Sequence, residues 1–189
     1  MRWSLSEDRE PAAGDCHTVA VTRDCDVYSW GLGDRGQVGQ GDSEQELRQP
    51  KRIATLEGLA VRHVSCGAEH TACAAGTDVL CFGANDNRQC GILASAQGGE
   101  APARVAKPKK VPFFTSLGIP ISMVACGGRH TLALTATGQV FGWGMNGNGQ
   151  LGLGAKGSDV GTPTSVEGLF GLPVTQVRIH GRPKFSACA

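Results

Sequence analysis

Residues 143–154 read WGMNGNGQLGLG, and residues 30–41 read WGLGDRGQVGQG. The two stretches superimpose without a gap as Trp-Gly, four variable residues, and then Gly-Gln-[Val/Leu]-Gly-x-Gly. Residues 82–93, FGANDNRQCGIL, form a weaker copy between them that keeps Phe82, Gly83, Gln89 and Gly91. Internal repetition of this kind predicts an array of similar structural units.

Two further elements recur with the same rhythm. The pattern Gly-x-x-His-Thr begins at Gly14, Gly67 and Gly127, and a decayed copy begins at Gly181. The pattern Pro-x-x-[Ile/Val]-x-x-[Leu/Phe] occupies residues 50–56, 108–114 and 163–169. Three elements that repeat in a fixed order indicate one kind of unit, built about three times along the chain.

Each unit contains short apolar segments on either side of a polar turn. In the first unit these are residues 17–21, HTVAV, and residues 27–31, VYSWG. Such a pattern is typical of a β-hairpin. The Pro-x-x-[Ile/Val] piece and a piece such as residues 61–64 are expected to add two more strands. Four antiparallel strands in 50 to 60 residues, with no extended helical periodicity, predict an all-β fold of β-propeller blades.

The repeats also give a domain division. We expect residues 1–13 to form a polar N-terminal tail, and residues 14–189 to form tandem repeats with breaks near residues 23, 76 and 137. The middle repeat is longer, and its extra residues, about 95–107, are rich in Ala, Gly, Pro and Lys. We expect them to form a loop insertion.

The net charge, the absence of targeting segments and the cysteine content limit the partners and the cellular location that we expect. Eighteen basic and seventeen acidic side chains give a formal net charge of +1, so no molecule-wide field favours nucleic acid or an anionic membrane. The N-terminus lacks the apolar core of a signal peptide, and no apolar run is long enough to span a membrane. We therefore expect the eight cysteines to be free thiols, and an intracellular location in the cytoplasm, the nucleus or both.

The glycines of the opening stretch raise the question of a nucleotide site. Gly142, Gly144 and Gly147 have the G-x-G-x-x-G spacing of a dinucleotide-binding turn. The same spacing in the first copy is out of register by two positions once the tryptophans are aligned, and no helical pattern follows either copy. A Walker-type loop fails because Ala155 stands where lysine is required. We interpret the stretch as a structural turn, and expect no cofactor-binding residues.

Other candidate sites have structural interpretations. Cys66 with His70, and Cys126 with His130, form C-x-x-x-H pairs that suit zinc chemically. Because each pair recurs at the same place in a different unit, packing and hydrogen bonding are favoured over metal binding. Paired acids such as Asp24 and Asp26 fall in a predicted turn, and the tryptophans are expected to pack between blades. We expect no metal-binding and no catalytic residues.

The run of residues 104–110, RVAKPKK, is the strongest basic segment. It could serve as a nuclear-import signal or contact phosphate groups. The favoured interpretation is a solvated loop.

Taken together, the motifs resemble the regulator-of-chromosome-condensation repeat family. The third copy carries Gly-Gln-Val-Phe-Gly-Trp-Gly at residues 138–144 and Gly-Gln-Leu-Gly at residues 149–152, and the second ends in residues 124–134, VACGGRHTLAL. The likeness covers roughly residues 14–181. It implies a seven-bladed ring, whereas this chain has material for about three and a half blades. We therefore expect an incomplete, open propeller, with possible self-association through its open blade edges.

The resemblance also implies functions. The leading hypothesis is a regulatory protein–protein interaction module without covalent catalysis of its own. The alternative is guanine-nucleotide exchange on a Ran-type small GTPase, although no motif carries the exchange surface over residue by residue. A second alternative is a piece of the regulatory region of a larger enzyme, such as a ubiquitin ligase or a kinase. A protein partner is expected in each case, with no membrane partner and no nucleic-acid signal beyond the basic run.

Overall fold

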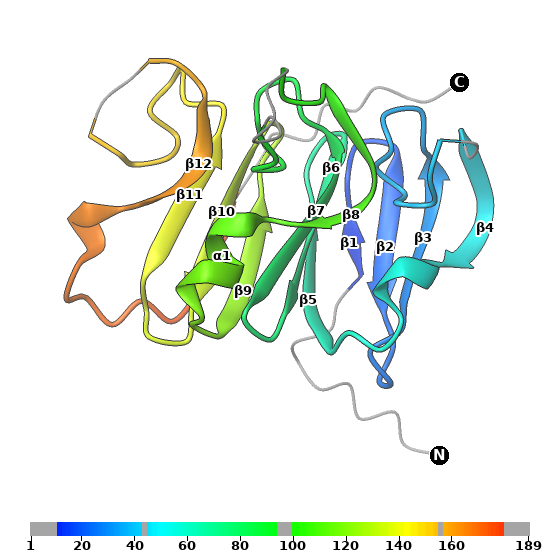
Figure 1. Cartoon of the computed structure of the whole chain (residues 1–189), viewed down its shortest axis with the longest axis horizontal. Coiled ribbons are helices and arrows are strands. Elements are labelled where there is room, and N and C mark those ends of the chain that lie inside the picture. Colours follow the sequence, from blue (N-terminus) through cyan, green and yellow to red (C-terminus); the bar gives the residue numbers. More distant parts are fainter. Residues whose placement is uncertain (1–10, 43–44, 94–99, 155–156, 180–189) are drawn as a thin grey trace.

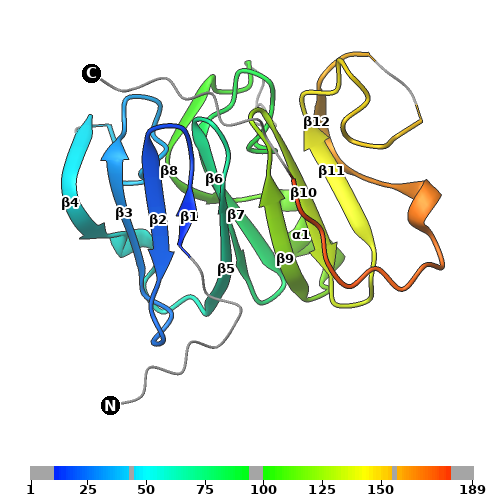
Figure 2. The same cartoon turned by 180° about the vertical axis from the view of Figure 1, so that it is seen from behind.

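The computed structural model describes residues 11–42, 45–93, 100–154 and 157–179, and it contains three four-stranded antiparallel sheets. The sheets lie side by side in chain order (Figure 1), and Figure 2 shows them from behind. We call them blades 1, 2 and 3. Blade 1 comprises β1 (Ala12–Ala13), β2 (His17–Val21), β3 (Val27–Leu32) and β4 (Glu46–Arg52). Blade 2 comprises β5 (Val61–Cys66), β6 (His70–Ala75), β7 (Asp78–Ala84) and β8 (Arg104–Lys110). Blade 3 comprises β9 (Ile121–Cys126), β10 (His130–Thr135), β11 (Val140–Gly144) and β12 (Val160–Ser165).

The predicted hairpins are confirmed in all three blades. The second and third strands pair antiparallel, with His17 opposite Gly31, His70 opposite Gly83, and His130 opposite Gly144. Each motif histidine therefore faces the glycine of a Trp-Gly or Phe-Gly pair. The two sequence elements that recur together are thus the two ends of one hairpin.

The Pro-x-x-[Ile/Val] pieces supply the outer strands, as predicted, but only with their first residues. Each proline lies inside an outer strand, and the apolar residue follows that strand and precedes a short helical turn. These turns are η1 (Ala54–Leu56), α1 (Pro112–Leu117) and η2 (Glu167–Leu169). Proline is tolerated because the outer strand is a sheet edge, where its missing N–H group costs no ladder hydrogen bond.

Two boundaries also differ from the expected ones. Strand β8 begins at Arg104, inside the expected loop insertion of 95–107, because Arg104 and Val105 pair with β7. The expected tail of residues 1–13 overlaps β1, whose Ala12 and Ala13 pair with Val19 and Thr18. Both differences arise because backbone pairing at a sheet edge needs no alternating apolar pattern. Residues 1–10 and 94–99 lie outside the described part of the chain.

The sequence repeats are offset from the blades. The expected breaks near residues 23, 76 and 137 fall in the turns between the second and third strands of each blade. The chain passes from one blade to the next at η1 and again at α1. One sequence repeat therefore supplies the two outer strands of one blade and the two inner strands of the next.

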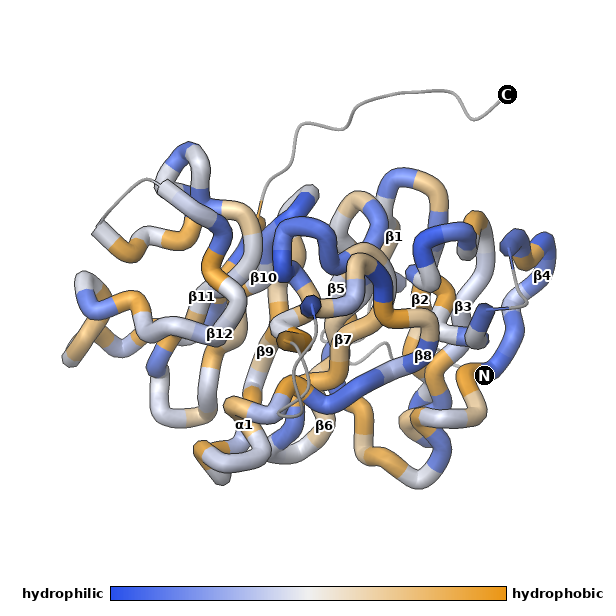
Figure 3. Tube along the Cα trace, turned by 45° about the horizontal axis from the view of Figure 1, so that its top comes forward, coloured by the Kyte–Doolittle hydropathy of each residue, from blue (hydrophilic) through white to orange (hydrophobic). Residues whose placement is uncertain are grey.

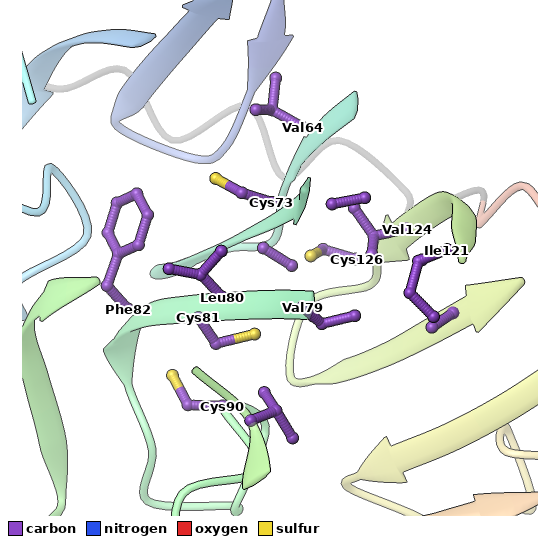
Figure 4. Close-up of a cluster of buried hydrophobic side chains, with 14 of the residues drawn as sticks. Val64, Cys73, Val79, Leu80, Cys81, Phe82, Cys90, Ile121, Val124 and Cys126 are labelled. Atoms are coloured by element: carbon purple, nitrogen blue, oxygen red, sulfur yellow. The ribbon is translucent and has the colours of Figure 1, made fainter. Parts of the chain in front are cut away.

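The main hydrophobic core runs through blade 2 into both neighbours. Strands β6 and β7 are almost wholly buried, and Figure 4 shows their side chains together with Val124 and Cys126 of β9. The outer strands β4 and β8 are largely hydrophilic in Figure 3. Blade 2 is thus the filled centre of the described structure. No helix among the described residues is both long and apolar enough for a membrane span.

Candidate interaction surface at the loop edge

Six loops gather at one edge of the three blades, the upper edge in Figure 1, which we call the loop edge. Three of them precede the second strands, at residues 14–16, 67–69 and 127–129. The others follow the third strands, within residues 33–45, 85–103 and 145–159. The loop edge therefore combines the Gly-x-x-His loops with the Gly-Gln-x-Gly turns.

A hydrogen-bonded relay joins neighbouring blades just beneath the loop edge. The Thr71 hydroxyl of blade 2 donates to the carbonyl oxygen of Gln37 in blade 1 at 2.9 Å, and lies 2.9 Å from Nε2 of His17. Because the single hydroxyl proton is used on the carbonyl, Nε2–H of His17 must donate to Thr71. This arrangement fixes the tautomer of the histidine and ties the second blade to two groups of the first.

The relay is built again between blades 2 and 3. Nε2 of His70 lies 2.9 Å from Oγ1 of Thr131, which donates to the carbonyl oxygen of Gln89 at 2.8 Å. His70 and Thr131 are both fully buried. Buried hydrogen bonds of this kind favour one packing arrangement over others. The Gly-x-x-His-Thr motif is therefore a blade-to-blade connector.

The relay histidines are held neutral. Burial lowers the pKa of His17 to about 4. Burial, followed by the neighbouring His17 and His130, lowers the pKa of His70 to about 3. Loss of hydration disfavours the charged imidazolium. At neutral pH both rings therefore serve as uncharged hydrogen-bond donors.

The motif glycines leave room for these rings. A Cβ atom on Gly67 would lie 2.2 Å from Cε1 of His70 and 2.4 Å from the carbonyl oxygen of Gly127 in the next blade. Beside this contact, the N–H of Ala68 donates to the carbonyl oxygen of Gly128 at 3.2 Å. Glycine is required here by close approach of two blades.

The Gly-Gln-x-Gly turn uses its own amide groups. In blade 3 the N–H of Gly149 donates to the carbonyl oxygen of Asn146 at 3.0 Å, and the N–H of Gly152 to that of Gly149 at 3.1 Å. The N–H of Asn148 donates to Oε1 of Gln150 at 2.9 Å. Amides that are already paired inside the turn do not form a phosphate cradle. This geometry favours the structural interpretation of residues 142–154.

Charged side chains cross the joint between blades 1 and 2 on the loop edge. The guanidinium of Arg35 in blade 1 hydrogen-bonds Asp86 of blade 2 and lies 4.0 Å from the carboxylate of Glu69. These side chains are between a third and a half exposed. Such ion pairs add little stability, so their importance lies in the charge that they present to solvent.

Each of the three Gly-x-x-His loops carries an exposed charged residue. Glu69 and Arg129 directly precede the motif histidines of blades 2 and 3, Asp15 lies two residues before that of blade 1, and all three are exposed. These three residues are thus acidic in blades 1 and 2 and basic in blade 3. The frame beneath is rigid, so these charges have fixed spacing.

The basic run takes a different place from the expected solvated loop. It forms β8, and its first residue, Arg104, donates to the carbonyl oxygen of Asp34 at 3.0 Å and to the carboxylate of Asp42 at 2.5 Å. Its last residue, Lys110, forms an ion pair with Asp78 at 2.6 Å. The ends of the run thus bind within the fold. The middle of the run lies along the outer strand of blade 2 and not on the loop edge.

The C-x-x-x-H pairs have separate partners. Cys66 Sγ donates to the carbonyl oxygen of Ala12 in blade 1 at 3.3 Å, whereas His70 donates to Thr131 of blade 3. In the other pair, Cys126 Sγ donates to the carbonyl oxygen of Ser65 at 3.3 Å, and burial raises its pKa to about 12. Cysteine and histidine thus serve different blade joints, which favours the structural interpretation over a metal site.

The charged loop-edge residues were not singled out from the sequence. Arg35 and Asp86 occupy variable positions between the Trp-Gly or Phe-Gly pair and the later glutamine, and Glu69 lies inside Gly-x-x-His. The usable signal is positional, because variable residues between invariant turn positions lie at loop tips. Pairing of Arg35 with residues from another blade follows only from the packing of the sheets.

Comparison with known proteins gives matches over most of the chain. The family model described as "Regulator of chromosome condensation (RCC1) repeat" matches residues 24–74, 78–134 and 137–182. The chain is 36% identical over 169 residues to the probable E3 ubiquitin-protein ligase HERC6 of Homo sapiens, covering 88% of this chain and 16% of the relative. It is 36% identical over 174 residues to the serine/threonine-protein kinase Nek9 of Xenopus laevis, covering 89% and 18%. The chain therefore spans less than a fifth of the length of these two relatives.

A solved structure agrees with the fold. The crystal structure of Prp20p from Saccharomyces cerevisiae superimposes with a TM-score of 0.71 and 27% identity, over 83% of this chain and 37% of that one. Prp20p is described together with its binding properties to Gsp1p and histones.

Proposed function

Because the chain belongs to the regulator of chromosome condensation repeat family, we propose that it is a regulatory protein-interaction module that binds its partner through the loop edge. The observation that carries this proposal is that exposed charged residues, Asp15, Glu69 and Arg129, lie in the Gly-x-x-His loops of all three blades. Fold alone does not assign function. Exposed charges on a fixed frame are a specific feature of this chain.

The frame favours binding without rearrangement. The relay hydroxyls of Thr71 and Thr131 are buried, and each bonds to a histidine and to a turn carbonyl of the preceding blade, so the turns of the loop edge are anchored to the next blade. Preorganised surfaces lose less conformational entropy on binding. A matching partner would present basic groups toward blades 1 and 2 and an acidic group toward blade 3, because complementary charge sets specificity and association rate.

The solved relative supports a protein as the class of partner. Prp20p is described with binding to Gsp1p and histones, and both are proteins. For this chain a folded protein partner is proposed, and a small GTPase is the first candidate to test.

Charge reversal tests the surface. Asp15→Arg and Arg129→Glu change exposed loop-edge residues, and Thr55→Arg is the matched control at the opposite edge, in η1. A partner obtained with the unmodified chain is purified, and its Kd for each variant is measured by calorimetry. We expect at least about a tenfold weakening for the loop-edge variants, in line with loss of rim charge complementarity, and no change for Thr55→Arg. Unchanged affinity in both loop-edge variants, with native circular dichroism, would contradict the proposal.

Guanine-nucleotide exchange is the second candidate function. It is favoured by the likeness to Prp20p, at a TM-score of 0.71 and 27% identity. The test is release of fluorescent GDP from a panel of Ran-type and other small GTPases. Faster release that Arg129→Glu reduces would support exchange through the loop edge. No acceleration with the chain in excess over every GTPase would exclude exchange by this chain.

A place in the regulatory region of a larger enzyme remains the third candidate. It is favoured by the short share, 16% and 18%, that the chain covers of the ligase and kinase relatives. Sequencing the full transcript decides it, because an attached catalytic domain would place this chain in that class. An intracellular location is proposed with it, and the free thiols of Cys66, Cys73, Cys81, Cys90 and Cys126 favour a reducing compartment.

A further inference from the structure

The two internal blade joints are built from the same complementary halves. At the joint between blades 2 and 3, the rings of Phe141 and Trp143 lie 5.8 and 5.5 Å from the ring of Phe114. At the joint between blades 1 and 2, the ring of Phe82 lies against Gly39, where a Cβ atom would be 2.9 Å from it. In each joint the later blade thus contributes an aromatic ring and a threonine. The earlier blade contributes a histidine, a turn and an apolar helical segment.

Blade 1 displays the later-blade half on its outer face. Thr18 corresponds to Thr71 and Thr131 in the motif, and Trp30 corresponds to Phe82 and Trp143. The four internal residues are fully buried, whereas Thr18 and Trp30 are only partly buried. We call the surface formed by Thr18, Tyr28 and Trp30 the first end face.

Blade 3 displays the earlier-blade half. His130 corresponds to the buried His17 and His70, yet it is only partly buried. Leu169 and Leu172 follow β12 just as the buried Leu56 and half-buried Leu59 follow β4, and Leu172 is 55% exposed. We call the surface of His130, Gln150, Leu169 and Leu172 the second end face. Figure 1 shows blades 1 and 3 at opposite ends of the row of blades.

The short inner strand of blade 1 and the segment that follows blade 3 are also complementary. Blade 1 has an inner strand of only two residues, Ala12–Ala13, compared with six in β5 and in β9. Beside blade 3, Val174 and Val177 pack against a small cluster around Val140. They repeat the spacing of Val61 and Val64 in β5. Blade 3 therefore already carries apolar side chains of the kind that the short β1 lacks.

Charges at the loop edge allow the same docking. Asn148 occupies the position of Arg35 in its repeat and Asp34 occupies that of Asp86, while Asp15 lies one residue before the position of Glu69. Docking the first end face on the second would bring the amide of Asn148 toward the carboxylate of Asp34, with Asp15 in the adjacent loop and no like charges facing each other across the joint among these three residues.

We propose that the first end face of one copy of this chain binds the second end face of another copy, head to tail, by repeating the internal blade joint. The ring of Trp30 would lie on the Gly149–Gly152 turn, and His130 would donate to Thr18. Such an interface is heterologous, because each copy uses a different surface on either side. Copies can therefore add in series.

Complementation of variants tests this arrangement. Trp30→Glu places a charge in the first end face and should prevent its binding. Leu172→Glu does the same in the second end face, at an exposed position. Arg48→Glu, on the outer strand β4 with a side chain 86% exposed, is the matched control. Mass is measured by sedimentation velocity and light scattering over a wide concentration series, with circular dichroism as the folding check. Tyr28→Glu replaces Trp30→Glu if the latter does not fold.

We expect the unmodified chain and Arg48→Glu to increase in mass with concentration, and each end-face variant alone to stay at the mass of one chain. An equimolar mixture of the two end-face variants should form a 1:1 dimer and nothing larger, because one intact pair of faces remains. A monomeric unmodified chain at every concentration would overturn the proposal. So would a mixture of folded variants that stays monomeric, or an end-face variant that still dimerises with itself.

Discussion

His70 and Thr131 are 61 residues apart in the chain, yet Nε2 of the histidine donates to the threonine hydroxyl at 2.9 Å across the joint of two blades. The hydroxyl in turn donates a hydrogen bond to the Gln89 carbonyl oxygen at 2.8 Å. In the unfolded chain each of these three groups bonds to water. On folding, those hydrogen bonds to water are replaced by hydrogen bonds within one buried network. Leaving one member unpaired costs more than the network contributes.

Replacing Thr131 by valine keeps the shape of the side chain and removes the hydroxyl. We expect Thr131→Val to lower the free energy of unfolding by about 1–3 kcal/mol, because Nε2–H of His70 and the Gln89 carbonyl oxygen lose their partner. Urea unfolding followed by circular dichroism measures the loss. Thr18→Val is the matched control, since Thr18 holds the same motif position but is partly exposed, and its effect should stay within about 0.5 kcal/mol. Equal losses at the two sites would contradict the relay.

Adding one methyl group at Gly67 should be more damaging than its size suggests. Its Cβ atom would lie 2.4 Å from the backbone oxygen of Gly127, and backbone cannot move aside as a flexible side chain can. We expect Gly67→Ala to cost about 2–4 kcal/mol of unfolding free energy, as overpacking of a tight core does. Gly128→Ala, where nothing lies within 4 Å of the added atom, should be close to neutral. Thermal unfolding of the two variants compares them directly, and a neutral Gly67→Ala would refute the close approach.

Stability should fall in acid below the ordinary histidine pKa. The folded-state pKa values, about 4 for His17 and about 3 for His70, are below the ordinary 6.5. The unfolded chain therefore binds more protons as pH drops below 6.5, and unfolding becomes easier until the folded-state pKa is reached. Each histidine contributes up to about 1.4 kcal/mol per pH unit in that window. Unfolding free energies measured from pH 7 downward test the slope.

The control for this pH dependence is His70→Gln, which keeps an N–H donor but does not titrate. Its unfolding free energy should vary less steeply with pH than that of the unmodified chain between 6.5 and the folded-state pKa of about 3. An unchanged slope would mean that His70 is not the titrating group.

Thiol chemistry should distinguish core cysteines from the rest. Cys73, Cys81 and Cys90 are fully buried (Figure 4), and burial raises the pKa of each well above the ordinary thiol value. Because the thiolate is the reactive form, we expect these three to resist iodoacetamide in the folded chain and to react after unfolding. Peptide mapping by mass spectrometry identifies the labelled sites, with partly exposed Cys25 as the comparison. Labelling of Cys81 at the rate of Cys25 in the folded chain would show that the core opens.

The sequence predicts the blades well because the hairpins are local. Residues 17–21 and 27–31 alternate in burial and are joined by a short polar turn, so their pairing depends on near neighbours. The outer strands were less well placed, since β4 and β8 carry mostly polar residues around Pro50 and Pro108. An edge strand is held by backbone pairing, which leaves little pattern in the side chains.

The loop edge could be predicted only as a location. Repeat alignment identifies variable positions such as Arg35, but its pairing with Asp86 depends on how two sheets pack. The sequence identifies the glycine of Gly-x-x-His only as part of a motif. The structure shows why glycine is needed at Gly67: a carbonyl oxygen of the next blade leaves no room for a Cβ atom. Contacts between blades therefore cannot be predicted from the spacing of residues within one repeat.

The offset between sequence repeats and blades has a consequence for how such chains can grow. A duplicated segment running from residue 24 to residue 74 would encode β3 and β4 together with β5 and β6. Inserted in tandem, its first half would complete the sheet begun upstream, and its second half would begin a sheet completed downstream. Every interior sheet would remain four-stranded, so a gene could gain or lose whole repeats without passing through an intermediate that carries half a sheet.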